Sequence, residues 1–192
     1  MYLNILGGHM EAEVRVKETG RTSYAGFGII LQKNKKHGID ILVVMEDPNK
    51  KEGGARWENF FVKFPGGSID SSDDIEKNSR LSGIKILSEV CGISFERLSD
   101  FPFFTAESES EEGKHLANFY LAKLEEGNPR PCKTLKSADM VSEEILRTFL
   151  KKNRFLKKHG QALEFLFFCL DRIRSGLDIP KEAKPLEEFL KS

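Results

Sequence analysis

The sequence predicts a single α/β domain built from several strands and helices, and three observations support this. Two β-like runs, residues 23–32 and 39–46, lie on either side of a short polar turn, as in a β-hairpin. A third run ends at Phe64 and is broken by a Pro-Gly-Gly sequence, after which an amphipathic helix is expected. The last third of the chain carries further helical patterns.

The N-terminal half is expected to supply most of the strands. Residues 12–17 alternate weakly between apolar and polar side chains, which favours an edge-like strand. In residues 23–32, Gly26 and Gly28 mark a bulge or a close backbone approach. A polar loop follows residue 46, and residues 57–64 return as a strand. Its Trp57, the only tryptophan, is interpreted as a core anchor, and the alternative is stacking on a base.

After the Pro-Gly-Gly sequence, we expect a helix, a strand, a loop and a further strand in turn. A helix is expected to begin near Ser72 or Asp73 and to end at Gly92, and Asp73 with Glu76 three residues later resembles a capping box. Both acids could therefore satisfy backbone N–H groups rather than bind a metal. A strand near 99–104, a mobile acidic loop at 105–114 and a strand at 115–124 are expected next.

Two helices are expected in the last third, from residue 142 to about 152 and from about 156 to 175. We expect one domain over residues 11–176, with its C-terminal helices at about 140–176. Residues 177–192 are expected to form a tail with one short amphipathic turn. Residues 1–10 end in Gly-Gly-His-Met, which is typical of a tag, so a tag or a disordered start is expected there.

The composition shows no strong charge bias. The chain has 192 residues with 30 Lys and Arg and 30 Asp and Glu, so its formal net charge is zero. This balance gives no global reason to expect nucleic acid or an anionic membrane as a partner. No apolar run approaches the ~18 residues that span a membrane, and a cytoplasmic location is expected. The three cysteines have no metal-binding spacing and are expected to be buried, reduced thiols: Cys91, Cys132 and Cys169.

The segment from Phe64 to Ile93 carries the main functional signal. It resembles the Nudix box, the signature of the MutT-like pyrophosphohydrolases, whose pattern is G-x5-E-x7-R-E-U-x-E-E-x-G-U with U aliphatic. Gly67 fits the opening glycine, Asp73 falls at the first acid, and Gly92 is followed by an aliphatic residue as the pattern requires.

The helical part of this segment departs from the pattern in length and in chemistry. Counting back from Gly92 places Lys85 at the arginine and Glu89 at the second of three helix glutamates. The other two glutamate positions hold Ile86 and Val90, which cannot coordinate a cation. The segment is also four residues longer than the pattern, so the resemblance implies a degenerate Nudix box with a reduced metal site.

The resemblance implies a Nudix-type α/β/α sandwich with a mixed β-sheet and additional C-terminal helices. It also implies Mg²⁺- or Mn²⁺-dependent hydrolysis of a nucleoside diphosphate linked to another moiety. In this interpretation Glu89 is the metal ligand or base and Lys85 orients it. Backbone oxygens of Gly66 and Gly67 contribute to cofactor binding, and Gly66 and Asp73 complete the metal ligands, since Mg²⁺ prefers hard oxygen donors.

Two alternatives to hydrolysis remain open from the sequence. One is a non-catalytic Nudix fold that binds nucleotides or regulates another protein, and the other is a protein-interaction domain whose C-terminal helices form a homodimer or partner surface. If the box is active, missing ligands could come from its own insertion or from the acidic loop, which offers four glutamates: Glu107, Glu109, Glu111 and Glu112.

Overall fold

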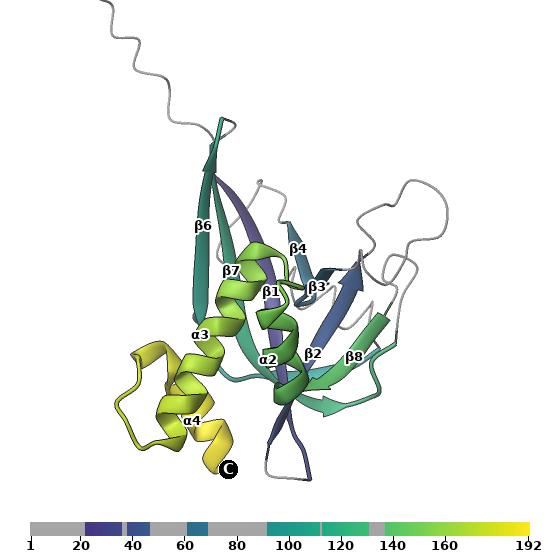
Figure 1. The fold of residues 1–192 in the computed structure, drawn as a ribbon, viewed down its shortest axis with the longest axis vertical. Helices are drawn as coiled ribbons and strands as arrows, with labels where there is room; N and C mark the ends of the chain where they lie inside the picture. Colours follow the sequence, from purple (N-terminus) through teal and green to yellow (C-terminus); the bar gives the residue numbers. More distant parts are fainter. Residues whose placement is uncertain (1–21, 36–37, 47–60, 69–91, 112, 131–136) are drawn as a thin grey trace, which may run out of the picture.

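The computed structural model describes residues 22–35, 38–46, 61–68, 92–111, 113–130 and 137–192. Within these ranges, eight strands form one mixed sheet, and the helices lie together on one of its faces (Figure 1). The strands are β1 (Ser23–Lys33), β2 (Ile39–Glu46), β3 (Phe61–Lys63), β4 (Gly66–Ser68), β5 (Ser94–Arg97), β6 (Phe104–Ser110), β7 (Gly113–Glu126) and β8 (Ser137–Ser142).

Two long parallel strands, β1 and β7, form the centre of the sheet, and shorter antiparallel strands share their outer edges. On the outer side of β1, β2 pairs with the C-terminal end and β4 with the N-terminal end. On the outer side of β7, β6 pairs with the first half and β5 with the second half. Strand β2 also pairs with β3 and β8. This mixed sheet confirms the predicted fold class.

The helices of the described part are α2 (Glu143–Lys151), α3 (Lys157–Arg174), the 3-10 turn η2 (Lys181–Ala183) and α4 (Lys184–Lys191). The two longer helices agree with their predicted positions. Residues 184–191, which we expected to lie in a tail with one short turn, form a helix whose Leu186 and Phe189 are buried. None of the helices in the described ranges is long and apolar enough to cross a membrane.

Apolar side chains cover both faces of the sheet. The helix-side core joins aromatic side chains of the sheet to Leu163, Leu166 and Leu170 of α3. A smaller cluster that includes Ile30 and Leu42 lies on the opposite face, because neighbouring residues of a strand point to opposite sides. Cys169 is a buried free thiol, as predicted, and burial raises its pKa to about 11.

The predictions for residues 93–142 were partly wrong. The expected mobile loop at 105–114 is a β-hairpin, because β6 pairs with β7 along its whole length. The strand expected near 99–104 is absent from that stretch, where β5 ends at Arg97 and β6 begins only at Phe104. Strand β8 was not predicted. The expected strand at 12–17, Trp57, the helix from Asp73 to Gly92, and Cys91 and Cys132 lie outside the described residues, apart from Gly92 itself.

Candidate functional site

The Pro-Gly-Gly turn between β3 and β4 lies in direct contact with β1. The backbone N–H of Gly28 donates to the carbonyl oxygen of Pro65 at 2.9 Å, and Gly67 is the pairing partner of Gly26. Gly66 has a φ of 148°, and a Cβ atom there would lie 2.1 Å from the Gly26 carbonyl oxygen. Only glycine therefore fits at residue 66, for steric and conformational reasons together.

A buried histidine from α3 holds the start of this turn. The backbone N–H of Phe64 donates to His159 Nδ1 at 3.0 Å, and only 5% of His159 is exposed. The imidazole packs against three phenylalanine rings, at centroid distances of 4.4 Å to Phe27, 5.2 Å to Phe119 and 5.9 Å to Phe64. No sequence pattern marked His159 as important, because its partners are far away in the chain.

The environment of His159 keeps its imidazole neutral. Burial, assisted by the positive charge of Lys63, lowers the pKa of His159 to about 3. A neutral imidazole has an unprotonated nitrogen, which is what the Phe64 N–H requires as an acceptor. Helix α3 thus fixes the backbone at Phe64, two residues before Gly66, through a hydrogen bond that does not change near neutral pH.

The structure places only some of the predicted site residues. Gly66 and Gly67 begin β4, whereas Asp73, Lys85 and Glu89 lie outside the described residues. Among the described residues, no three His, Cys, Asp or Glu side chains are grouped so as to hold a metal ion. The backbone oxygens at Gly66 and Gly67 are donors of the type that suits Mg²⁺. The carboxylates predicted to complete the site are not part of the described chain.

The acidic segment is ordered by its pairing in the hairpin. Glu107 and Glu109 alternate with Ala106, Ser108 and Ser110 along β6, and Ala106 is buried in the helix-side core. The two glutamates therefore point to the opposite face. Glu107 forms an ion pair with Lys114 at 2.6 Å. Glu111 lies in the hairpin turn, and Glu112 lies outside the described residues.

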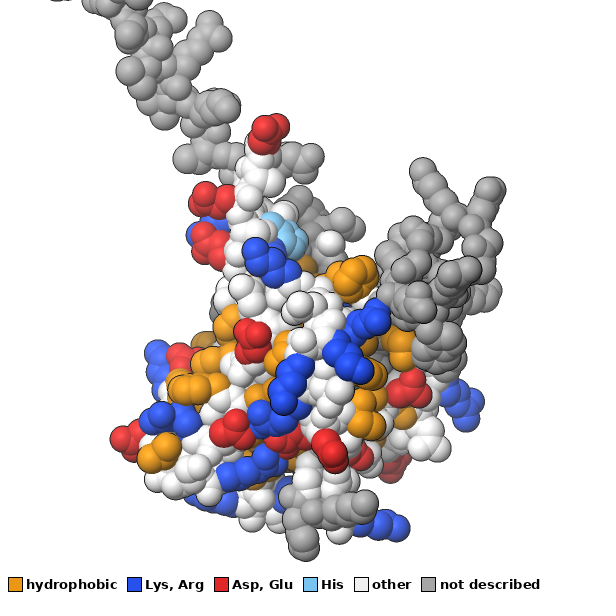
Figure 2. All heavy atoms as spheres, in the orientation of Figure 1, with side chains coloured by type: hydrophobic (Ala, Val, Ile, Leu, Met, Phe, Trp, Pro, Cys, Tyr) orange, Lys and Arg blue, Asp and Glu red, His pale blue; other side chains and the backbone are white. Residues whose placement is uncertain are grey.

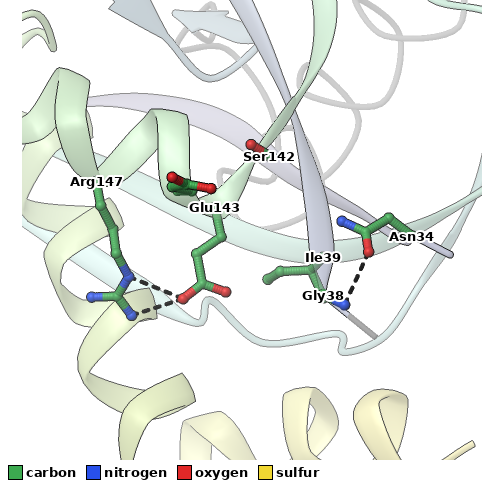
Figure 3. Close-up of a pocket in the computed structure, with 7 residues that line it drawn as sticks. Asn34, Gly38, Ile39, Ser142, Glu143 and Arg147 are labelled. Carbon is green, nitrogen blue, oxygen red and sulfur yellow. Dashed lines mark hydrogen bonds and ion pairs between the residues drawn. The ribbon is translucent and has the colours of Figure 1, made fainter. Parts of the chain in front are cut away.

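A pocket lies at the C-terminal end of β1, where the β1–β2 hairpin meets the start of α2 (Figure 3). This pocket has a volume of about 410 Å³ and is lined by Asn34, Gly38, Ile39, Ser142, Glu143, Glu144 and Arg147. The carboxylate of Glu143 is its most buried charge. It accepts hydrogen bonds from Arg147 at 2.8 Å and from Arg174 at 2.7 Å.

The Glu143 carboxylate connects α2 to α3. Burial raises its pKa, but the hydrogen bonds from Arg174 and Arg147 outweigh this effect, so the pKa of Glu143 is lowered overall. Arg147 also bonds to Asp171 of α3 and lies over the Phe167 ring. Both carboxylate oxygens of Glu143 accept hydrogen bonds from arginines. We therefore interpret Glu143 as a structural residue rather than a ligand-binding one.

Replacing Glu143 with glutamine is expected to lower the free energy of unfolding by about 1.5–3 kcal/mol, the range for hydrogen bonds to charged groups. Two arginines would then lose their common acceptor charge. Urea denaturation at pH 7 measures the change. The matched control is Glu144→Gln, because Glu144 is exposed and in the same helical turn. Equal effects of the two substitutions would contradict a special role for Glu143.

Comparisons with known proteins bear on the fold. No family model and no curated protein matches the sequence. The structure is similar to a NUDIX hydrolase from Alicyclobacillus acidocaldarius, with a TM-score of 0.60, 15% identity, and coverage of 85% of this chain and 100% of the other.

Two further solved structures are similar to the chain. One is an Ap4A hydrolase binary complex from C. elegans, with a TM-score of 0.54, 16% identity, and coverage of 78% of this chain and 98% of the other. The other is the NUDIX domain of Shewanella oneidensis NrtR complexed with ADP ribose. Its TM-score is 0.51 at 12% identity, with coverage of 80% and 90%. Likeness at such low identity establishes a common architecture, and the chain therefore has the Nudix fold, as the resemblance to the Nudix box predicted.

Proposed function

We propose that the chain is a Nudix-type hydrolase that cleaves a nucleoside diphosphate linked to another moiety, using a reduced metal site. The observation that carries the proposal is the turn at Gly66, where only glycine fits and which leads directly into the box-like segment. Two solved structures with the same fold add support, since one is an Ap4A hydrolase and the other is complexed with ADP ribose. In both of these small molecules a nucleoside is joined through phosphates to another moiety.

The residue roles in this proposal follow the Nudix-box resemblance. Glu89 is the remaining helix carboxylate and acts as metal ligand or base, and Lys85 orients it. Asp73 and the backbone oxygens at Gly66 and Gly67 complete the oxygen donors. Mg²⁺ or Mn²⁺, when bound, neutralises phosphate charge and activates a water molecule. Mg²⁺ commonly binds through one or two carboxylates plus substrate phosphates, so a reduced box is compatible with catalysis.

The decisive experiment is phosphate release from a substrate panel by the full chain. The panel contains nucleoside diphosphate sugars, dinucleoside polyphosphates, ADP ribose and NADH, each tested with Mg²⁺, with Mn²⁺ and with EDTA. We expect metal-dependent turnover that Glu89→Gln lowers by at least about 100-fold, the lower end of general acid–base effects. The control Glu144→Gln removes an exposed acid of a different helix and should leave the rate unchanged.

Two outcomes would contradict the proposal. Absence of turnover across the panel, from protein shown to be folded, would overturn the hydrolase function. A nucleotide-induced increase in melting temperature that is independent of metal would then favour the non-catalytic nucleotide-binding alternative. Turnover that is unaffected by Glu89→Gln would keep the hydrolase but reject the assignment of Glu89.

A further inference from the structure

On the helix-side face of the sheet, the side chains change along the strands from aromatic to small to polar. The registers of β6, β7 and β1 align side chains in three rows that run across these strands. The first row is aromatic and lies beneath His159, the second consists of buried alanines, and the third is polar. The rows are Phe104–Phe119–Phe27, Ala106–Ala117–Ala25 and Ser108–His115–Ser23.

The polar row and one lysine of α3 form a connected cluster, which we call the Ser-His-Lys cluster: Ser23, His115 and Lys158. The Ser23 hydroxyl oxygen lies 2.7 Å from His115 Nδ1. The Lys158 ammonium donates to the backbone carbonyl of His115 at 3.2 Å. His115 and Lys158 are partly buried, and Ser23 is exposed, so the cluster is open to solvent.

Within the part of the chain that the structure describes, the cluster brings a lysine ammonium and an imidazole together with no carboxylate partner. Among the described residues, neither His115 nor Lys158 forms an ion pair with a carboxylate. Burial lowers the pKa of Lys158, and burial together with the charge of Lys158 lowers the pKa of His115. Both pKa shifts disfavour the charged form of the side chain, and no carboxylate among the described residues opposes them.

The nearest acids of the hairpin lie on the other side of the sheet. Glu107 and Glu109 alternate with Ser108, so they point away from the face that carries His115 and Ser23. Glu107 is also neutralised by Lys114. In the space-filling view, acidic side chains gather at the tip and outer side of this hairpin, while a histidine and a basic side chain lie together beside it (Figure 2). Alternation along β6 thus directs these two glutamates away from the cluster.

We propose that the Ser-His-Lys cluster binds a phosphate group between Ser23, His115 and Lys158. The ammonium group has further N–H donors beyond the one that contacts the carbonyl, and a phosphate accepts several such bonds. When Ser23 donates to Nδ1, the neutral imidazole has its proton on Nε2, which can donate to an anion. When the imidazole is protonated, Nδ1 donates to Ser23, and the hydroxyl hydrogen becomes available to the phosphate.

The position of the cluster in the fold bears on where such a phosphate comes from. Ala25 pairs with Ser68, the last residue of β4, and Ser23 lies two residues before Ala25, at the start of β1. The cluster is thus near the point where the box-like segment leaves the sheet. The group bound there is either a phosphate of the substrate or free inorganic phosphate, and both present the same charged oxygens.

The test is titration of the full chain with inorganic phosphate in EDTA, followed by NMR of the His115 imidazole. We expect saturable shifts of the His115 resonances and a rise in the pKa of His115 when phosphate is bound. Lys158→Met should weaken phosphate binding about tenfold or more, the effect of losing one charge-assisted hydrogen bond. The control is Lys157→Met, which removes the neighbouring exposed lysine and should change the affinity little.

A second arm identifies the source of the phosphate. ADP ribose in EDTA that shifts His115 and competes with phosphate would assign the site to a substrate phosphate, whereas a response to inorganic phosphate alone would assign it to the free ion. Absence of a saturable His115 shift with either probe, or equal weakening by Lys158→Met and Lys157→Met, would overturn the site. Since no turnover is measured, these outcomes are independent of the proposed hydrolysis.

Discussion

Gly66→Ala is expected to lower the free energy of unfolding by about 2–5 kcal/mol, combining overpacking with backbone strain. The added Cβ would lie 2.1 Å from the Gly26 carbonyl oxygen and 2.7 Å from the Phe27 Cα atom. Both are backbone atoms of β1, so relief requires that β4 separate from β1. The φ of 148° is a further cost, because side-chain-bearing residues rarely adopt it.

Urea denaturation of Gly66→Ala and Gly176→Ala separates these two contributions. Gly176, which follows α3, has a φ of 67° but no heavy atom within 4 Å of an added Cβ. Gly176→Ala should lower the free energy of unfolding only by the strain of the left-handed conformation, roughly 1–2 kcal/mol. If Gly66→Ala proves no more destabilising than Gly176→Ala, the close approach of the turn to β1 is not a real constraint. If the turn supports catalysis as proposed, hydrolysis should also fall more in Gly66→Ala.

His159 should make the stability of the chain depend on pH in mildly acidic solution. The folded-state pKa is about 3, whereas an unfolded histidine has the ordinary value of 6.5. The unfolded chain therefore binds a proton first as pH falls. The stabilisation is complete above about pH 6.5 and is lost progressively toward pH 3, at about 1.4 kcal/mol per pH unit.

His159→Gln tests this prediction, because it removes the titration and keeps a polar side chain. At pH 7 we expect a loss of about 1–3 kcal/mol, since the Phe64 N–H would lose a well-placed acceptor. Between pH 6.5 and 4.5, where most carboxylates stay ionised, the difference from the unsubstituted chain should shrink. His115→Gln serves as the control, because His115 is far less buried. If the free energy of unfolding changed with pH in the same way for the original chain and for His159→Gln, His159 would not be a buried neutral histidine with a lowered pKa.

Gly66 and His159 both fix the position of the same turn. Gly66 allows the turn to contact β1, and His159 bonds the backbone of Phe64, just before the turn, to α3. The segment that carries the proposed catalytic Glu89 therefore starts from a backbone fixed by the central strand and by a C-terminal helix. A rigid starting point of this kind helps to position catalytic groups on the segment that follows.

The sequence by itself determined the elements whose pattern is local. The alternation and β-branched residues of 23–32 and 39–46 identified two strands, and helical periodicity identified α2 and α3. The Pro-Gly-Gly break, followed by the box-like spacing, was sufficient to predict the fold. Those features are encoded within a few residues of each other, so no knowledge of distant partners was needed.

The tertiary structure alone decided the elements and contacts that depend on distant partners. The acidic 105–114 segment has a composition typical of a loop, yet its pairing with the long strand β7 makes it a strand. Strand β8 pairs with β2 almost a hundred residues earlier in the chain, and α4 owes its burial to the core. His159 and Lys158 likewise meet their partners only when α3 packs on the sheet, and Ser23 meets His115 only when β1 pairs with β7. Backbone pairing and burial across long separations leave no local sequence pattern.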